Sequence, residues 1–109
     1  MIYVFDEIRA KPGQLRALEK LLRERYVPGA RRRGMELVDL CITPVLELPA
    51  NGSHLVALWR LADVAAWWRM RLAAAADPDV AACWKAIDGL AESRSRHFLA
   101  PIGNKEGGA

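Results

Sequence analysis

Four polar residues interrupt otherwise apolar stretches of this 109-residue chain: Asp6, Asp39, His54 and Arg60. Carboxylates and an imidazole in apolar surroundings suit proton transfer, because burial shifts their pKa values toward neutrality. An arginine in the same site could hold a carboxylate or an enolate oxygen. We therefore predict the two aspartates and the histidine as catalytic residues, and the arginine as a substrate-binding residue.

These four residues differ in their surroundings. Asp6 lies in the middle of an apolar stretch, where an unpaired buried charge is costly. It is therefore expected either to be held by a cation such as Arg60 or to serve as a general acid or base. His54 begins its stretch, and Asp39 belongs to a strand expected at the sheet edge. The alternative for all of them is a solvated position at the rim, or an ion pair across a dimer.

The stretch His54–Leu61 is expected to organise the fold. It is rich in Leu, Val and Trp, follows the turn signal Asn51–Gly52, and ends shortly before Asp63, a residue type that caps helices. This pattern predicts a buried strand that is entered from a hairpin and left into a helix. Similar patterns predict three further strands, which are Ile2–Arg9, Met35–Thr43 and Ser93–Ala100.

Apolar residues at helical spacing predict helices between these strands. The first helix begins after the turn Pro12–Gly13 and is expected to close at Gly34 in a left-handed conformation. Pro28 should break or kink it, because proline lacks an amide donor. The second helical segment begins at the capping residue Asp63 and is divided at Asp77–Pro78, where proline suits the first position of a new helix.

Four tryptophans invite the interpretation of an aromatic ligand cage. Strand and helix phase instead favour core positions for Trp59 and Trp84. Trp67 and Trp68 are adjacent on a helix, so one of them must face the pocket or a dimer seam. The predicted inner face of their helix comprises Val64, Trp67, Trp68, Leu72 and Ala75.

The order of elements is β-α-β-β-α-β, which is the ferredoxin-like pattern of an α+β fold. It predicts a four-stranded antiparallel sheet in the order 4-1-3-2, with all helices on one face. Residues 1–102 should form a single domain, followed by a flexible polar tail at 103–109. The bare sheet face would be partly apolar, so we expect a second copy to cover it in a homodimer.

The sequence also resembles NIPSNAP-type proteins of the dimeric α/β-barrel group, from Met1 to about Pro101. The matching segments are Met1–Ile2–Tyr3, Lys11–Pro12–Gly13, Leu58–Trp59 before Asp63, Ala76–Asp77–Pro78, and Ala100–Pro101. The resemblance implies a ferredoxin-like protomer whose sheet packs against a twin to enclose a pocket. Related barrels include isomerases, cyclases, monooxygenases and some haem-binding proteins.

Strand alternation predicts which side chains line that pocket. The expected helix-facing sets are Tyr3 and Phe5; Val38, Leu40 and Ile42; and Leu55, Ala57, Trp59 and Leu61. The bare face then carries the catalytic candidates together with these predicted substrate-binding residues: Val4, Ile8, Cys41, Val56, Leu58, Arg60 and Arg96. Alternation in the last strand fits two phases, one with Arg96 in the pocket and one with His97.

Composition and motifs exclude several classes of function. Hydrophobic residues make up 52% of the chain, yet no apolar run approaches the roughly 18 residues of a membrane span. The net charge is only +3, and no aromatic residues alternate with the basic residues of the run Arg31–Arg32–Arg33, as they would in a nucleic-acid site. We therefore expect neither a nucleic-acid nor a membrane partner. Two cysteines without metal spacing predict free thiols and no metal site. No basic leader precedes the first strand, and we expect a cytoplasmic location.

Two classes of function remain. The first is a cofactor-independent enzyme that acts on a small apolar or aromatic organic molecule, either by proton transfer, as an isomerase or cyclase, or by monooxygenation of an activated phenol or enol. The second is a non-catalytic protein that binds a ligand in the same pocket. A variant of the second is a haem-binding barrel that uses His54 or His97.

Overall fold

The computed structural model describes residues 1–46 and 53–103. The hairpin signal Asn51–Gly52 and the predicted tail from residue 104 onward lie outside these residues. The elements follow the predicted order: β1 (Ile2–Ala10), α1 (Leu15–Leu21), η1 (Leu22–Tyr26), α2 (Val27–Arg32), β2 (Glu36–Thr43), β3 (His54–Leu61), α3 (Val64–Ala76), α4 (Pro78–Leu90) and β4 (Ala91–Leu99).

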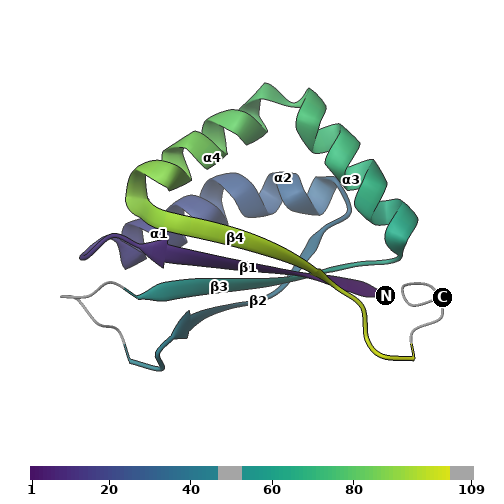
Figure 1. The fold of residues 1–109 in the computed structure, drawn as a ribbon. Coiled ribbons are helices and arrows are strands. Elements are labelled where there is room, and N and C mark those ends of the chain that lie inside the picture. The colour runs from purple at the N-terminus through teal and green to yellow at the C-terminus, as the bar shows by residue number, and fades with distance from the viewer. Residues whose placement is uncertain (47–52, 104–109) are drawn as a thin grey trace.

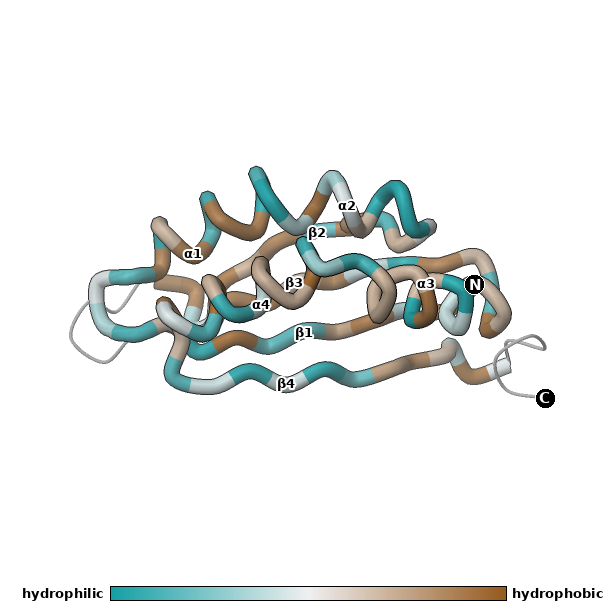
Figure 2. The backbone as a smooth tube through the Cα atoms, turned by 90° about the horizontal axis from the view of Figure 1, so that it is seen from above, coloured by the Kyte–Doolittle hydropathy of each residue, from teal (hydrophilic) through white to brown (hydrophobic). Residues whose placement is uncertain are grey.

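The four strands form one antiparallel sheet in the order β2-β3-β1-β4, which confirms the predicted ferredoxin-like α+β fold. All helices lie on one face of this sheet, and the other face is open (Figure 1). Seen from above, α1 and α2 run along the β2 side, α3 and α4 cover the middle, and β4 lies beyond the helical layer (Figure 2). The β4 edge of the sheet is therefore not covered by a helix.

The first helical segment is continuous, although Pro28 lies inside it. A π-helical turn, Leu22–Tyr26, precedes the proline, and the amide of Val27 donates to the carbonyl of Leu22, five residues earlier. A proline ring clashes with the carbonyl four residues before it in a regular α-helix, and a wider turn relieves that clash. The expected break is thus replaced by a π turn, at whose end the buried Tyr26 lies.

The helix ends are those expected from the sequence. Gly34 has φ of +93°, and the Asp63 side chain accepts a hydrogen bond of 2.7 Å from the amide of Ala66. The side chain of Asp77 accepts from the amide of Asp79, and Pro78 begins α4. Among the described residues, none of the helices has the length and apolar character needed to cross a membrane.

The predicted facing of β1 is wrong. Its buried residues are Ile2, Val4, Asp6, Ile8 and Ala10, which lie beneath the helices, whereas Tyr3 and Phe5 are half-buried on the open face. Both alternating sets of this strand contain large apolar residues, so periodicity alone did not decide between them. The predicted pocket residues Val4, Asp6 and Ile8 therefore belong to the helix side.

The other strands largely follow their predicted phases. Leu55, Ala57, Trp59 and Leu61 are buried beneath the helices, as expected. In β2, Leu40 and Ile42 pack against the core, but Val38 is 47% exposed because the pairing register shifts between Leu37 and Asp39. In β4 the predicted position of Arg96 on the bare face is wrong, because Arg96 lies opposite Asp6 and faces the helices with it. His97 then lies on the open face, where its ring contacts that of Phe5.

The predicted inner face of α3 is partly wrong. Ala66, Trp67 and Met70 are buried, while Trp68 is 60% exposed and Leu72 is 72% exposed. Only one of the adjacent tryptophans faces inward, as their helical geometry requires.

Both cysteines are free thiols, as predicted, and the sheet separates them. Cys41 is exposed on edge strand β2, and Cys83 is buried beneath α4, where burial raises the pKa of its thiol despite the nearby Arg25 and Arg33. Because the thiolate is the reactive form, we expect iodoacetamide to modify one thiol per chain in the native protein and two in denaturant, as measured by mass spectrometry. Cys41→Ser should abolish the native modification. Two fast-reacting native thiols would contradict this placement.

Candidate functional site

An ion pair between β1 and β4 lies under the helices. Asp6 and Arg96 are opposite each other in the register, and two hydrogen bonds join them: Nε to Oδ1 at 2.6 Å and Nη2 to Oδ2 at 2.9 Å. The side chain of Asp6 is 4% exposed and that of Arg96 is 23% exposed. This bidentate geometry is the strongest form of an arginine–carboxylate pair.

Aromatic residues complete the surroundings of this pair. The indole Nε1 of Trp59 donates to Oδ2 of Asp6 at 2.9 Å, and Nη2 of Arg96 also donates to the Tyr26 hydroxyl at 3.2 Å. The Tyr26 ring lies between Trp59 and Trp84, with centroid distances of 5.5 Å and 4.7 Å. Asp6 thus accepts three hydrogen bonds, so its charge is balanced and its oxygens are satisfied.

The same contacts keep Arg96 charged. Burial alone disfavours the charged guanidinium, but the hydrogen bond to Asp6 and the proximity of Tyr26 outweigh it, so the pKa of Arg96 is raised above its ordinary value. Asp6 therefore has a permanent cationic partner, and its role in this geometry is to orient Arg96.

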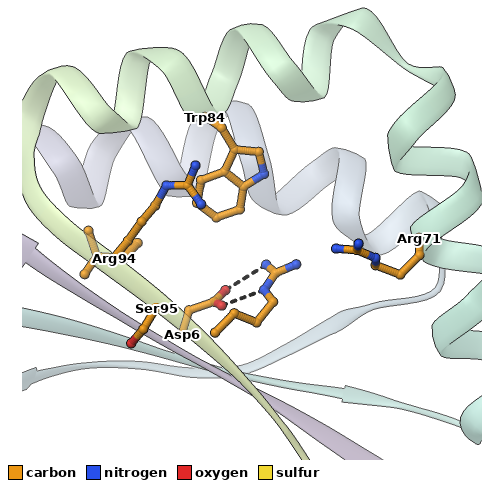
Figure 3. Close-up of a pocket in the computed structure, with 7 residues that line it drawn as sticks. Asp6, Arg71, Trp84, Arg94 and Ser95 are labelled. Atoms are coloured by element: carbon orange, nitrogen blue, oxygen red, sulfur yellow. Dashed lines mark hydrogen bonds and ion pairs between the residues drawn. The ribbon is translucent and has the colours of Figure 1, made fainter.

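A cleft of about 290 Å³ opens above this ion pair, between α3, α4 and β4. We call it the β4 cleft. Its lining includes Ile8, Arg71, Trp84 and Arg94 together with the ion pair (Figure 3). Two further hollows adjoin it, and both share Arg71 and Arg96 with it, so the cleft continues along α3.

The walls of the β4 cleft are aromatic. Trp67 on α3 and Phe98 on β4 are stacked, with ring centroids 4.6 Å apart and an interplanar angle of 20°. On the α4 side, the guanidinium groups of Arg94 and Arg96 lie 4.4 Å and 5.4 Å from the centroid of the Trp84 ring. Trp84 is therefore part of the cleft wall, and not only of the core as predicted. Trp84 lines the cleft itself, and the Trp67–Phe98 pair lines an adjoining hollow, so a flat organic ligand that extends along the cleft would meet aromatic side chains in both.

The arginines of the cleft have different partners. Arg94 donates two hydrogen bonds to Asp88, at 2.6 Å and 3.3 Å, and Arg96 is paired with Asp6. Arg71 extends from α3 toward the ion pair (Figure 3), and its guanidinium lies 5.8 Å from the centroid of Trp67. Among residues 1–46 and 53–103, no carboxylate forms an ion pair with Arg71.

The structure does not bring the predicted catalytic residues together, because the sheet separates them. Asp39 is exposed on β2 and accepts a hydrogen bond from the amide of Leu40. His54 lies on the open face with its Nδ1 2.6 Å from Oε1 of Glu7. The histidine and Asp39 therefore lie outside the β4 cleft.

The predicted substrate-binding residues are divided in the same way. Arg60 pairs with Glu36 on the open face and does not hold Asp6. Cys41, Val56 and Leu58 lie on that face as well. Of the predicted set, only Ile8 and Arg96 line the cleft, and Val4 is buried in the core.

Sequence reasoning missed Arg71, Arg94, Trp84 and Tyr26 as site residues. One local signal was present: Trp67 and Arg71 are four positions apart on a helix and so share a face. Tyr26 carried no such signal, because a tyrosine in an apolar helical stripe is typical of a core. In the part of the chain that the structure describes, no group of three or more His, Cys, Asp or Glu residues is arranged to hold a metal ion.

Solved structures with the same fold cover nearly the whole chain. A NIPSNAP domain protein from Burkholderia xenovorans has a TM-score of 0.75 at 20% identity, over 93% of this chain and 94% of its own. A NIPSNAP family protein from Agrobacterium tumefaciens has a TM-score of 0.73 at 21% identity, over 92% and 91%. An antibiotic biosynthesis monooxygenase has a TM-score of 0.61 at 16% identity, over 93% and 98%.

No protein-family model matches the sequence, and neither does any curated protein. The solved NIPSNAP structures nevertheless confirm the resemblance to NIPSNAP-type proteins at the level of the fold.

Proposed function

We propose that this chain, which has the NIPSNAP-type fold, is a small-molecule enzyme that binds a flat, largely apolar organic molecule in the β4 cleft. The reaction proposed is cofactor-independent turnover of an enol or an activated phenol, by isomerisation or cyclisation, or by monooxygenation with dioxygen. In the last case the substrate itself supplies the two electrons, one oxygen atom enters the product as a carbonyl and the other leaves as water. The observation that carries the proposal is a cleft with aromatic walls and three converging arginines, Arg71, Arg94 and Arg96.

The chemistry follows from which groups in the cleft are already engaged. Asp6 and Asp88 both accept hydrogen bonds from arginines, so neither is placed to remove a proton from a ligand. Guanidinium groups beside aromatic walls can instead stabilise an oxyanion that the substrate forms by losing its own acidic proton. Enols and phenols are substrates of this kind, since their anions are the reactive forms. The likeness to an antibiotic biosynthesis monooxygenase supports this class of reaction.

A second candidate function is non-catalytic binding of the same type of ligand. It is favoured by the engagement of both carboxylates, since no general base of the described residues is left unpaired in the cleft. We do not propose haem binding in the β4 cleft, because His54 and His97 lie on the open face of the sheet and not in the cleft.

The partner we propose is a second copy of this chain, packed on the open sheet face. The centre of the open face consists of apolar or aromatic residues that are half-buried: Tyr3, Phe5, Val56 and Leu58. Charged pairs, Glu7–His54 and Glu36–Arg60, lie toward its two ends. An apolar centre with a polar rim is typical of a subunit interface.

Ligand binding in the cleft is tested with 1-naphthol, a flat phenol. We expect it to quench the tryptophan fluorescence of the protein saturably, and Trp84→Leu to weaken binding by up to about tenfold through loss of ring stacking. Phe5→Leu, on the opposite face of the sheet, is the matched control and should leave binding unchanged.

Turnover is followed by oxygen uptake with naphthol, and by exchange of the α-carbon protons of a tetralone with solvent. Turnover above the protein-free rate supports the enzyme, and saturable binding without turnover supports the binding protein. Absence of saturable binding, or equal weakening by both variants, would remove the cleft as the functional site.

A further inference from the structure

We infer that the natural ligand of the β4 cleft is an aromatic monocarboxylate whose carboxylate is bound by Arg71. This inference rests on the proposed function, because it assumes that the cleft is a ligand site. It adds the charge of the ligand, its chemical class and the residue that selects it.

The charge of the ligand follows from the ion pairs of the cleft. Arg94 and Arg96 form ion pairs with Asp88 and Asp6, whereas Arg71 forms no ion pair with a carboxylate of the described residues. The other two arginines are held in bidentate pairs, and the uncompensated cation is therefore Arg71. A ligand with one negative charge would supply the counter-charge that Arg71 lacks, whereas a dianion such as a phosphate ester would add a second negative charge near Asp6 and Asp77.

The position of Arg71 suits a carboxylate at the end of a flat ligand. Its side chain leaves α3 and points into the space above the Asp6–Arg96 pair (Figure 3). Trp67 precedes it by one helical turn, and the guanidinium lies over that indole. Arg71 also lines both adjoining hollows, so it is the cation that a ligand lying along the cleft would meet. A planar guanidinium binds a carboxylate through two parallel hydrogen bonds.

The aromatic class of the ligand follows from the walls beside Arg71. The stacked pair Trp67–Phe98 lines the adjoining hollow that shares Arg71 and Arg96 with the cleft, and Trp84 lines the cleft itself. Phe98 is 46% exposed, so a face or edge of this pair is available to a ligand ring. The volume of about 290 Å³ is enough for a ring system of one or two rings with a carboxylate substituent. Asp77 lines an adjoining hollow and is a further carboxylate near the cleft. Its side chain caps α4 by accepting a hydrogen bond from the amide of Asp79.

The experiment compares 2-naphthoate with 2-naphthamide, which have the same shape but differ in charge. Binding is measured by tryptophan fluorescence and confirmed by calorimetry, at low and at physiological salt. We expect the parent protein to bind the carboxylate at least about tenfold more tightly than the amide, because a charge-assisted hydrogen bond is formed only with the acid. Arg71→Gln should remove this preference and leave amide binding unchanged.

Arg69→Gln is the matched control, since Arg69 is an exposed arginine of the same helix and lines none of the three hollows. It should keep the preference for the carboxylate. Circular dichroism of both variants verifies that they are folded. Inorganic phosphate should not compete with naphthoate; competition would show that the site accepts any anion and would overturn the assignment to a carboxylate.

The failure of this inference differs from the failure of the proposed function. If acid and amide bind equally well and Arg71→Gln changes neither, the cleft binds ligands but Arg71 does not select their charge. If neither compound binds saturably, the proposed function fails as well. An equal loss of preference in Arg69→Gln would indicate general electrostatic attraction and would also overturn the role of Arg71.

Discussion

Asp6→Asn is expected to lower the free energy of unfolding by about 3 kcal/mol, because it leaves the guanidinium of Arg96 buried without its counter-charge. The amide cannot replace the carboxylate in this site. Oδ1 accepts from Arg96 and Oδ2 accepts from both Arg96 and Trp59, so either orientation of an asparagine points its NH₂ group at an N–H donor. The measurement is urea unfolding at fixed protein concentration, followed by far-ultraviolet circular dichroism.

Two comparisons make this result specific to the ion pair. Asp39→Asn changes the same residue type at an exposed position and should shift stability by no more than about 0.5 kcal/mol. Arg96→Gln combined with Asp6→Asn should cost less than the sum of the single changes, because each single change strands the other partner. A variant Asp6→Asn with the parent's urea midpoint but without turnover would contradict the anchoring role and favour Asp6 as a catalytic group.

Leu58→Asp is expected to convert a homodimer into a monomer. Leu58 lies opposite Phe5 at the centre of the open face, and in a two-fold symmetric dimer each substitution places a carboxylate in the shared apolar interface. Burying such a charge without a partner costs several kcal/mol, so the dissociation constant should rise by about a hundredfold or more. Sedimentation should give twice the 12.1 kDa chain mass for the parent and the single mass for the variant.

Leu72→Asp is the control for this substitution, since Leu72 is 72% exposed on α3, in the helical layer on the other side of the sheet. It should leave the mass unchanged. A parent protein that is folded and monomeric at micromolar concentration would refute the proposed partner, and a dimeric Leu58→Asp variant would place the interface elsewhere.

The order and ends of the elements could be predicted because their signals are local. Asp63 caps α3 through an amide three residues away, and Gly34 closes α2 by its own backbone conformation. The strand His54–Leu61 was predicted with its observed bounds and facing. One of its alternating sets begins and ends with the polar residues His54 and Arg60, so only the other set could be buried as a whole.

The facing of β1 depended on a contact that is distant in the sequence. Each set of this strand contains charged as well as apolar residues, with Glu7 and Arg9 in one and Asp6 in the other, and an isolated Asp6 would favour the more accessible face. The charge is buried because Arg96, 90 positions later, lies opposite it and supplies a bidentate partner. The charges Glu7 and Arg9 in the other set were a local signal for the observed facing, but the cost of burying Asp6 is set by a partner that only strand pairing brings close.

The candidate site was likewise decided by tertiary structure. The sequence predicted a mostly apolar pocket that contains Asp6 and an arginine, and the β4 cleft contains Asp6 and Arg96. It placed the pocket on the bare sheet face, whereas Arg71, Trp84 and Arg94 join Asp6 and Arg96 on the helix side. Periodicity assigns each side chain to a face of its own helix or strand. The packing of α3 and α4 over the sheet determines which of these faces meet and whether a gap remains between them. In this protein the two helices leave the β4 edge of the sheet uncovered (Figure 2).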